Sequence, residues 1–241
     1  NRYVRGNIHL TKVDSEYPDN KLTGATFEVY KDSNANGKMD DGDELLGTLT
    51  EKEKGEYSMN DLFYGRYFVK ETKAPEGFVL DTGVYEVMID TNGKTYEVEN
   101  KAGVGFINDA MRGNLKIVKT SSDGKVKGFA FRITGANGYD IILETNDKGE
   151  IFIDELRIGD YTISEVSNSA SSMYVLPADK KATVKLGSTT IVEMHNVLRD
   201  TPKTGDTTNL PLLYALAGLS AVGIAVCGVI GFKKKKKEDR N

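Results

Sequence analysis

The sequence predicts an all-β protein in which two tandem β-sandwich domains are followed by a C-terminal transmembrane helix. Three observations predict this architecture. Short segments that alternate apolar and polar residues fill most of the chain, and clusters of Gly, Asn, Asp and Ser separate them. One strand-rich pattern occurs twice. An uncharged apolar run, residues 210–232, lies near the end of the chain.

The duplication is visible at two matching segments. Asn1 to Gly6 reads NRYVRG and Asn108 to Gly113 reads NDAMRG, and a similar strand, NIHLTKVD or NLKIVKTSSD, follows each of them. A fixed separation between matching segments indicates an internal repeat. We therefore expect residues 1–5 to end a preceding copy, and the two domains to occupy residues 6–110 and 111–198.

Each copy contains several predicted strands. Those of the first copy are ATFEVY (25–30), LLGTLT (45–50), GRYFVKE (65–71), VYEVMID (84–90) and GVGFIN (103–108). Those of the second are LKIVK (115–119), FAFRIT (129–134), DIILE (140–144), GEIFID (149–154), GDYTISE (159–165), KATVKL (181–186) and TTIVEMHN (189–196). No long helical period precedes the C-terminal segment. Short strands at this spacing are typical of a sandwich.

Side-chain parity places three polar residues of each copy on an apolar face, because alternate residues of a strand point to the same side. In each strand the polar residue follows two apolar residues of its own parity. The first copy has Ile8, Leu10, Lys12; Tyr67, Val69, Glu71; and Val104, Phe106, Asn108. The second has Leu115, Ile117, Lys119; Tyr161, Ile163, Glu165; and Val192, Met194, Asn196. Each domain is thus expected to bury a lysine, a glutamate and an asparagine.

Burial of these three groups predicts a covalent reaction between them. Apolar surroundings lower the pKa of a lysine and raise the pKa of a glutamate, which leaves a neutral amine beside a protonated carboxyl. The amine can attack the carboxamide while the acid hydrogen-bonds the amide oxygen and moves protons, so that ammonia leaves and a Lys–Asn isopeptide bond remains. Ordinary hydrogen bonds or a buried ion pair are the alternative interpretation. Asn100 is a rival acceptor in the first domain.

The residues around these positions resemble a known family. KLTGATFEVYKD and GRYFVKETKAPEGF look like the collagen-adhesin B-type (SpaA-like, prealbumin-like) domains of Gram-positive adhesins and pilins. The resemblance implies a prealbumin-like or Ig-like sandwich and an intramolecular Lys–Asn bond promoted by a glutamate. It assigns two linked pairs, each with its promoter: Lys12 and Asn108 with Glu71; Lys119 and Asn196 with Glu165. SNSASSMY stands in the second domain where Ala-Pro-Glu-Gly follows in the first.

The C-terminal segment combines three parts. The motif and spacer, residues 199–209, contain the pentapeptide Thr201, Pro202, Lys203, Thr204 and Gly205. The apolar run 210–232 exceeds the roughly 20 residues that cross a bilayer as a helix. The lysines of the tail 233–241 favour the cytoplasmic side. We therefore expect the preceding domains to be extracellular.

This order of parts resembles the LPXTG-type cell-wall sorting signal of Gram-positive surface proteins. The resemblance implies that a sortase cysteine attacks the carbonyl between Thr204 and Gly205 and passes the acyl group to a peptidoglycan precursor. Thr201 stands where leucine is usual, which leaves the sortase class open. An ordinary membrane anchor is the alternative. A chain of this topology also needs a signal peptide, so we expect a longer precursor.

Charge and cysteine content exclude some classes of function. The formal net charge is −4, and residues 206–241 contribute six basic and three acidic residues, so residues 1–205 carry −7. Such an acidic region argues against nucleic acid as a partner. Cys227, the only cysteine, lies in the apolar run, so the outer domains have no disulfide. No phosphate loop, zinc pattern or nucleophile elbow is present, and no cofactor is required.

One loop carries a candidate calcium pattern. DSNANGKMDDGD (32–43) spaces its oxygen-bearing residues as an EF-hand-like loop does, and Gly37 permits the tight turn. The candidate ligands are Asp32, Asn34, Asn36, Lys38, Asp40 and Asp43. A solvated acidic hairpin loop is the alternative interpretation.

These observations predict a structural role. We expect the stalk of a sortase-anchored, cell-wall-attached Gram-positive adhesin, synthesised as a membrane-spanning precursor and stiffened by its own isopeptide bonds. Two alternatives stay open, a pilin subunit polymerised by sortase and a domain that binds a host extracellular matrix protein directly. An enzyme is not expected, because each isopeptide bond forms once and within one chain.

Overall fold

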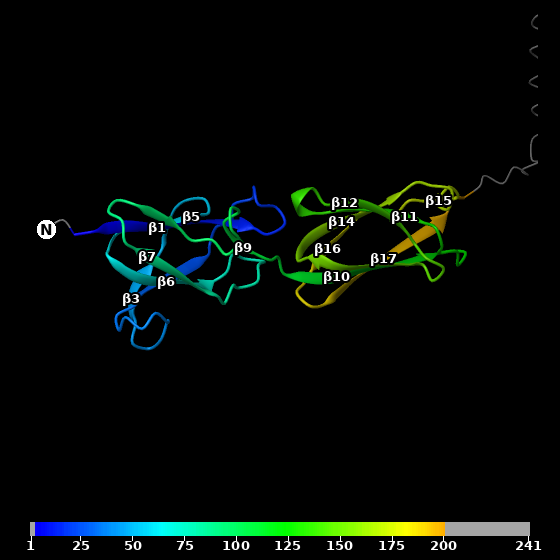
Figure 1. Ribbon diagram of the computed structural model, residues 1–241. Helices are drawn as coiled ribbons and strands as arrows, with labels where there is room; N and C mark the ends of the chain where they lie inside the picture. The colour runs from blue at the N-terminus through cyan, green and yellow to red at the C-terminus, as the bar shows by residue number, and fades with distance from the viewer. Residues whose placement is uncertain (1–2, 201–241) are drawn as a thin grey trace, which may run out of the picture. The chain divides into compact units, whose positions relative to one another are not determined.

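A computed structural model describes residues 3–200, which form two β-sandwich modules in tandem (Figure 1). The first module contains β1 (Arg5–Asp14), β2 (Thr26–Lys31), β3 (Glu44–Thr48), β4 (Thr50–Glu53), β5 (Glu56–Phe63), β6 (Gly65–Lys73), β7 (Val84–Ile89), β8 (Thr95–Glu97) and β9 (Phe106–Asn108). The second contains β10 (Arg112–Ser121), β11 (Ala130–Thr134), the 3-10 turn η1 (Ala136–Gly138), β12 (Asp140–Glu144), β13 (Glu150–Arg157), β14 (Gly159–Val166), β15 (Tyr174–Val175), β16 (Lys180–Val184) and β17 (Thr189–Leu198).

The predicted membrane helix at residues 210–232 lies outside the described residues. Within residues 3–200, no helix is long and apolar enough to cross a membrane. The all-β prediction is confirmed for both modules.

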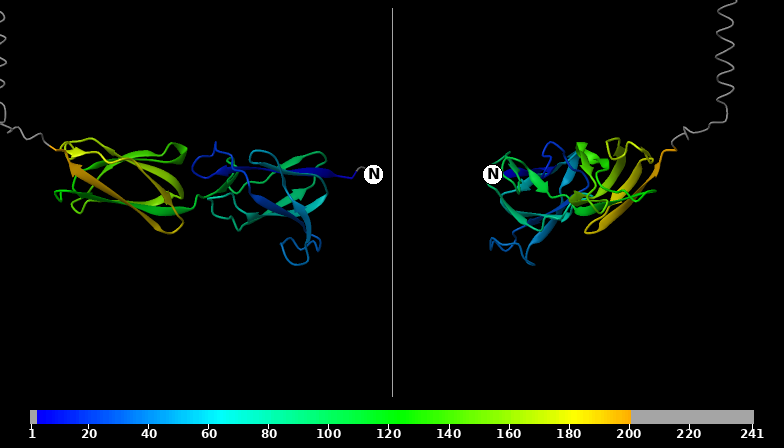
Figure 2. Two further views of the ribbon diagram at one scale, coloured as in Figure 1. Left: turned by 180° about the vertical axis from the view of Figure 1, so that it is seen from behind. Right: turned by 90° about the vertical axis from the view of Figure 1, so that its right-hand side faces the viewer.

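Each module consists of two facing sheets (Figure 2). In the first module, one sheet has the order β4-β5-β1-β8 with β9 also paired to β1, and the other has the order β3-β2-β6-β7. In the second module the orders are β13-β10-β17-β15 and β12-β11-β14-β16. Most of the arrangement therefore recurs: β10 and β13 take the places of β1 and β5, and the long strand β17 takes the places of both β8 and β9.

The first and last strands of each module lie side by side and run parallel. Lys12 on β1 is the register partner of Phe106 on β9, and Asp14 is the partner of Asn108. In the second module Lys119 on β10 is opposite Met194 on β17, and the partner of Asn196 is Ser121. The two ends of each module thus come together in one sheet.

Alternating side chains build the core of each module. Along β1, the apolar residues Ile8 and Leu10 are fully buried, whereas the intervening positions are half-buried. Phe27 of β2 and Phe106 of β9 meet edge to face, with ring centroids 4.9 Å apart, and so join the two sheets. Burial of such alternating apolar residues is the main driving force for a sandwich.

Strand β5 was not among the predicted strands, because its apolar period breaks in the middle. Tyr57 and Leu62 are both buried, although they are five positions apart and would point to opposite faces of a regular strand. The irregularity is a β-bulge at Asp61, whose φ is 63°. The side chain of Asn7 stabilises the bulge by accepting the Asp61 backbone N–H at 3.0 Å.

Candidate functional site

Three polar side chains meet in the core of the first module. Lys12 projects from β1 and Asn108 from the neighbouring strand β9, while Glu71 projects from β6 in the facing sheet. Their exposed fractions are 0%, 3% and 0% respectively. The core-facing orientation that parity predicted is therefore the one observed.

The Lys12 amine lies against the Asn108 carboxamide. Lys12 Nζ donates to Asn108 Oδ1 and, at 3.1 Å, to the Phe106 carbonyl. Its distance to Glu71 Oε1 is 3.7 Å. Asn108 Nδ2 donates to both oxygens of Glu71, at 3.0 and 2.9 Å. Amine, carboxamide and carboxyl group are thus neighbours in a site closed to water.

Burial shifts the proton affinities of this site in the direction that a reaction needs. Burial lowers the pKa of Lys12 to about 8, and the attraction of Glu71 opposes that shift only in part. Burial also raises the pKa of Glu71, against the hydrogen bonds from Asp81 and Asn108. A neutral amine is a nucleophile, and a protonated carboxyl can supply a proton.

The contacts assign a role to each group in isopeptide formation. In such a reaction, a bond would form between Lys12 Nζ and Asn108 Cγ, the Cγ–Nδ2 bond would break, and a proton would pass from Nζ to Nδ2 so that ammonia could leave. Glu71 contacts the departing nitrogen and is placed to transfer that proton. The acid was expected on the amide oxygen, whereas in this structure Glu71 contacts the amide nitrogen.

Asn100, the rival acceptor, makes other contacts. Its side chain binds both backbone groups of Ile107 and donates to Asp81 Oδ2 at 2.8 Å. Within the described part of the chain, the contacts of the Lys12 amine are with Phe106, Asn108 and Glu71. The geometry therefore favours Asn108 as the acceptor.

The second module buries the corresponding residues in a looser arrangement. Lys119, Glu165 and Asn196 are 1%, 8% and 0% exposed. Asn196 Nδ2 donates to Glu165 Oε1 at 2.7 Å. The Lys119 amine instead donates to the Thr120 carbonyl and lies 4.0 Å from the centre of the Phe129 ring. Burial lowers the pKa of Lys119 and raises the pKa of Glu165, as in the first module.

Two buried oxygen atoms mark a place for the Lys119 amine. Within residues 3–200, Glu165 Oε2 and Asn196 Oδ1 have no hydrogen-bond partner. Buried acceptors of this kind are normally satisfied, because leaving them unpaired costs about 1–3 kcal/mol. Rotation of the Lys119 side chain toward them would reproduce the contacts of Lys12.

Comparison with known proteins agrees with the repeated sandwich. The SpaA family, a prealbumin-like fold domain, matches residues 6–102 and 113–197. The chain belongs to the SpaA family. Its two modules are hereafter called the first and second SpaA domains.

Individual relatives share part of this chain. The trypsin-resistant surface T6 protein of Streptococcus pyogenes serotype M6 is 28% identical over 184 residues, which are 75% of this chain and 30% of that protein. The TIE protein of Bacillus anthracis has 24% identity and a TM-score of 0.58, with 81% of this chain and 34% of that chain covered. The chain thus spans about a third of the length of these relatives.

The loop 32–43 between β2 and β3 of the first SpaA domain closes on its own polar groups. Asp32 accepts the backbone N–H groups of Asn36 and Gly37 at 3.1 and 3.0 Å, and its Oδ2 lies 3.5 Å from Arg66. The side chains of Asn34 and Asn36 donate to Asp40. In the described ranges, no group of three or more His, Cys, Asp or Glu side chains is placed to hold a metal. Calcium binding stays a prediction.

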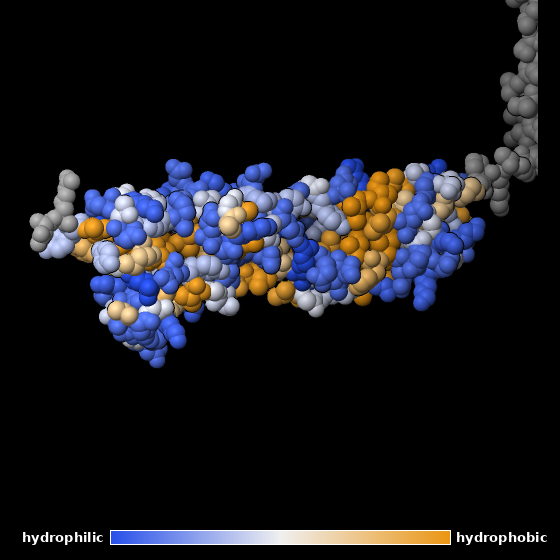
Figure 3. Space-filling model, in the orientation of Figure 1, coloured by the Kyte–Doolittle hydropathy of each residue, from blue (hydrophilic) through white to orange (hydrophobic). Residues whose placement is uncertain are grey.

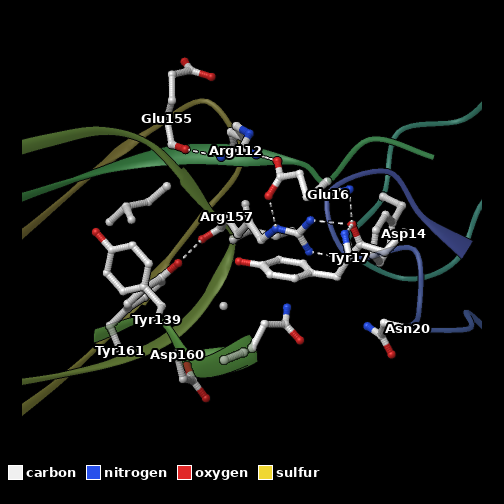
Figure 4. A pocket seen from close by; sticks show the side chains of 18 of the residues that line it. Asp14, Glu16, Tyr17, Asn20, Arg112, Tyr139, Glu155, Arg157, Asp160 and Tyr161 are labelled. Carbon is white, nitrogen blue, oxygen red and sulfur yellow. Dashed lines mark hydrogen bonds and ion pairs between the residues drawn. The ribbon is translucent and has the colours of Figure 1, made fainter. Parts of the chain in front are cut away.

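A second polar cluster connects the two SpaA domains (Figure 4). Arg157 at the end of β13 donates to both oxygens of Asp14, each at 2.6 Å, and to Glu16 at 2.9 Å. Its guanidinium also lies over the ring of Tyr17, 4.8 Å from the centroid. Arg112 forms a further ion pair with Glu16. These groups line a pocket of about 430 Å³.

Three residues around these sites were not identified from the sequence: Asp81, which supports the first buried site, and Arg157 and Asp14, which join the domains. Asn100 was identified, but as a rival acceptor; the structure shows it bound to Asp81 and Ile107. A weak signal for Asp14 is its position in NIHLTKVD, where it has the same parity as the buried residues Ile8, Leu10 and Lys12. The predicted sortase pentapeptide, Thr201 to Gly205, lies outside the described residues.

Proposed function

We propose that the chain is the stalk region of a sortase-anchored Gram-positive surface adhesin, stiffened by self-formed Lys–Asn isopeptide bonds. The observation that carries this proposal is the buried contact of Lys12 with Asn108, next to Glu71. SpaA family membership and the surface T6 protein relative support an extracellular, cell-wall location. The pentapeptide 201–205 and the apolar run 210–232 support attachment through sortase to peptidoglycan, after a membrane-spanning precursor stage.

The position of the proposed bond explains why it suits a stalk. Lys12 and Asn108 lie on the first and last strands of their domain, 96 positions apart in sequence. A covalent link between these strands carries tension directly from one end of the domain to the other, so the segment between them is not stretched. By analogy with a disulfide that closes a long loop, the link would add on the order of 4 kcal/mol to the free energy of unfolding.

Single-molecule force spectroscopy on residues 1–200 tests this role. These residues contain both complete cores and coincide closely with one compact unit, Asn1–Leu198. The linked wild-type domain should not release the 96-position segment, whereas Asn108→Ala should release about 330 Å of chain at about 3.4 Å per residue. The second SpaA domain of the same molecule serves as the control. Equal extension of the wild type and the variant would contradict the proposal.

A polymerised pilin is the alternative within the same class. In that case a lysine of one copy accepts the acyl group of the next, and wall extracts contain a ladder of covalent polymers that resists detergent. A single wall-linked species supports the monomeric stalk.

Direct binding of a host matrix protein is the second candidate, and one observation favours it. Apolar side chains gather on the visible surface of the second SpaA domain (Figure 3). Its edge strand β12 exposes Ile142 by 57% and Leu143 by 37%. Apolar patches of this kind often mark interaction surfaces. Binding of matrix proteins by residues 1–200, abolished in Ile142→Lys, supports this candidate, and absence of binding removes it.

A further inference from the structure

Strand β9, which carries Asn108, is short and has little backbone pairing. It contains three residues, Phe106–Asn108, and pairs with β1 only over these residues. A strand held by so few hydrogen bonds leaves the reacting carboxamide poorly fixed, unless side chains supplement the pairing.

The side chain of Asn100 supplies such bonds. Asn100 Oδ1 accepts the Ile107 N–H at 2.6 Å, and Asn100 Nδ2 donates to the Ile107 carbonyl at 2.8 Å. The carboxamide therefore pairs with Ile107 as a neighbouring strand would. Because Ile107 directly precedes Asn108, these two bonds fix the backbone beside the reacting group.

Asp81 connects this support to the acid of the site. Its carboxylate accepts Asn100 Nδ2 at 2.8 Å and the Tyr85 hydroxyl at 3.0 Å. Its backbone N–H donates to Glu71 Oε2 at 2.8 Å. One residue thus holds both the promoter glutamate and, through Asn100, the strand of the acceptor.

The second SpaA domain fixes its acceptor differently. Strand β17 contains ten residues, Thr189–Leu198. It pairs continuously with β10, from Asn114 opposite Thr189 to Ser121 opposite Asn196. A continuous ladder of backbone hydrogen bonds replaces the side-chain support. The Asp81–Asn100 pair therefore supplements the short pairing of β9, which is specific to the first domain.

We propose that Asn100, held by Asp81, is a positioning residue that aligns the Asn108 carboxamide for attack by Lys12. This inference rests on the proposed isopeptide reaction. It concerns alignment, since Asn100 contacts neither the amine nor the departing nitrogen. A misplacement of about 1 Å can slow a reaction about 100-fold, so loss of two backbone contacts should be visible in the rate.

The test measures how fast each domain becomes linked. Residues 1–200 are made by cell-free synthesis, samples are quenched in acid at intervals, and peptide mapping gives the linked fraction of each domain. Asn100→Ala should slow linkage of the first domain on the order of tenfold or more. The second domain should link at its wild-type rate in the same molecules.

Two further variants separate positioning from stability. Asn7→Ala removes an asparagine side chain that binds backbone in the same domain, at the Asp61 bulge, and that makes none of the contacts of Lys12, Glu71 or Asn108. It should link within about threefold of wild type, even where its melting temperature falls as much as that of Asn100→Ala. Asn100→Asp places a carboxylate against Asp81 and against the Ile107 carbonyl and should be slow. Adding Asp81→Asn restores the hydrogen bond between residues 81 and 100 but not the one to the Ile107 carbonyl, so it should recover the rate only in part.

The outcomes distinguish failure of the proposed isopeptide function from failure of the positioning role of Asn100. If wild-type chains never lose ammonia from either domain, the isopeptide function itself is wrong. If wild type links but Asn100→Ala links equally fast, or Asn7→Ala is slowed as much as Asn100→Ala, the positioning role is overturned and the isopeptide function is kept.

Discussion

The Lys119 amine and the Asn196 carboxamide occupy the same buried region without contacting one another through a hydrogen bond. Lys119 donates to the Thr120 carbonyl, while Asn196 Oδ1 has no partner within residues 3–200. In the first SpaA domain, by contrast, Lys12 donates directly to Asn108. The two domains therefore start from different geometries, although their strands correspond.

This difference predicts an order of linkage. If the proposed isopeptide bonds form, the first domain already has its amine against the carboxamide, whereas the second would first have to rotate a buried lysine side chain. We expect the first domain to become linked before the second in a time course of newly folded residues 1–200, followed by peptide mapping. Thr120 contributes its backbone carbonyl, so Thr120→Ala should leave the order unchanged. Simultaneous linkage, or earlier linkage of the second domain, would show that the observed side-chain positions do not limit the rate.

The pKa of Lys12 predicts the pH dependence of the first linkage. Burial lowers it to about 8, and only the neutral amine attacks. Below pH 8 the protonated amine dominates, which slows the attack, while deprotonation of Glu71 removes the acid as the pH rises. The rate should therefore be highest at an intermediate pH and fall on either side. Refolding of unlinked chains into buffers between about pH 6 and about pH 9 measures this profile. A rate independent of pH across that range would contradict a titrating amine.

The contact between Arg157 and Asp14 predicts mutual stabilisation of the two domains. Asp14 is fully buried, so Arg157→Ala leaves a buried carboxylate without its cation and should lower the free energy of unfolding by about 3 kcal/mol. Urea unfolding followed by tyrosine fluorescence measures the loss. Arg132→Ala is the matched control, because Arg132 makes a similar two-bond contact with Asp140 at the surface. It should cost under about 1 kcal/mol; equal small losses would refute the interdomain contact.

The loop 32–43 gives a separate prediction about calcium. If its alternating oxygens wrap the ion, titration calorimetry on residues 1–200 should show uptake in the millimolar range or tighter, as in weak extracellular sites. Asp32→Ala should abolish the signal. Asp41→Ala should preserve it, because Asp41 is an exposed residue of the same loop outside the ligand spacing. Absence of uptake by the wild type would leave an ordinary acidic hairpin loop.

Much of the fold and the core of the candidate site could be predicted from the sequence. Parity along a strand is a local property, so the burial of Lys12, Glu71 and Asn108 followed from their apolar neighbours. Strand β5 was not predicted, because the bulge at Asp61 reverses the parity of its side chains halfway along the strand. A bulge depends on the partner strand, which the local pattern does not contain.

Contacts between distant segments were the other part that the pattern could not supply. Asn100 looked like a rival acceptor, since only three-dimensional pairing with Ile107 shows what its carboxamide binds. The bond from Arg157 to Asp14 joins residues 143 positions apart and has no periodic signature. The side-chain rotation that separates Lys119 from Asn196 is likewise invisible in a sequence repeat.

The intact mass of residues 1–200 tests the isopeptide claim most directly. Each bond releases one ammonia, so two linked domains should weigh about 34 Da less than the sequence mass. Glu71→Ala and Glu165→Ala should each restore about 17 Da, because the proton transfer to the departing nitrogen is lost. A wild-type mass equal to the sequence mass would contradict the account.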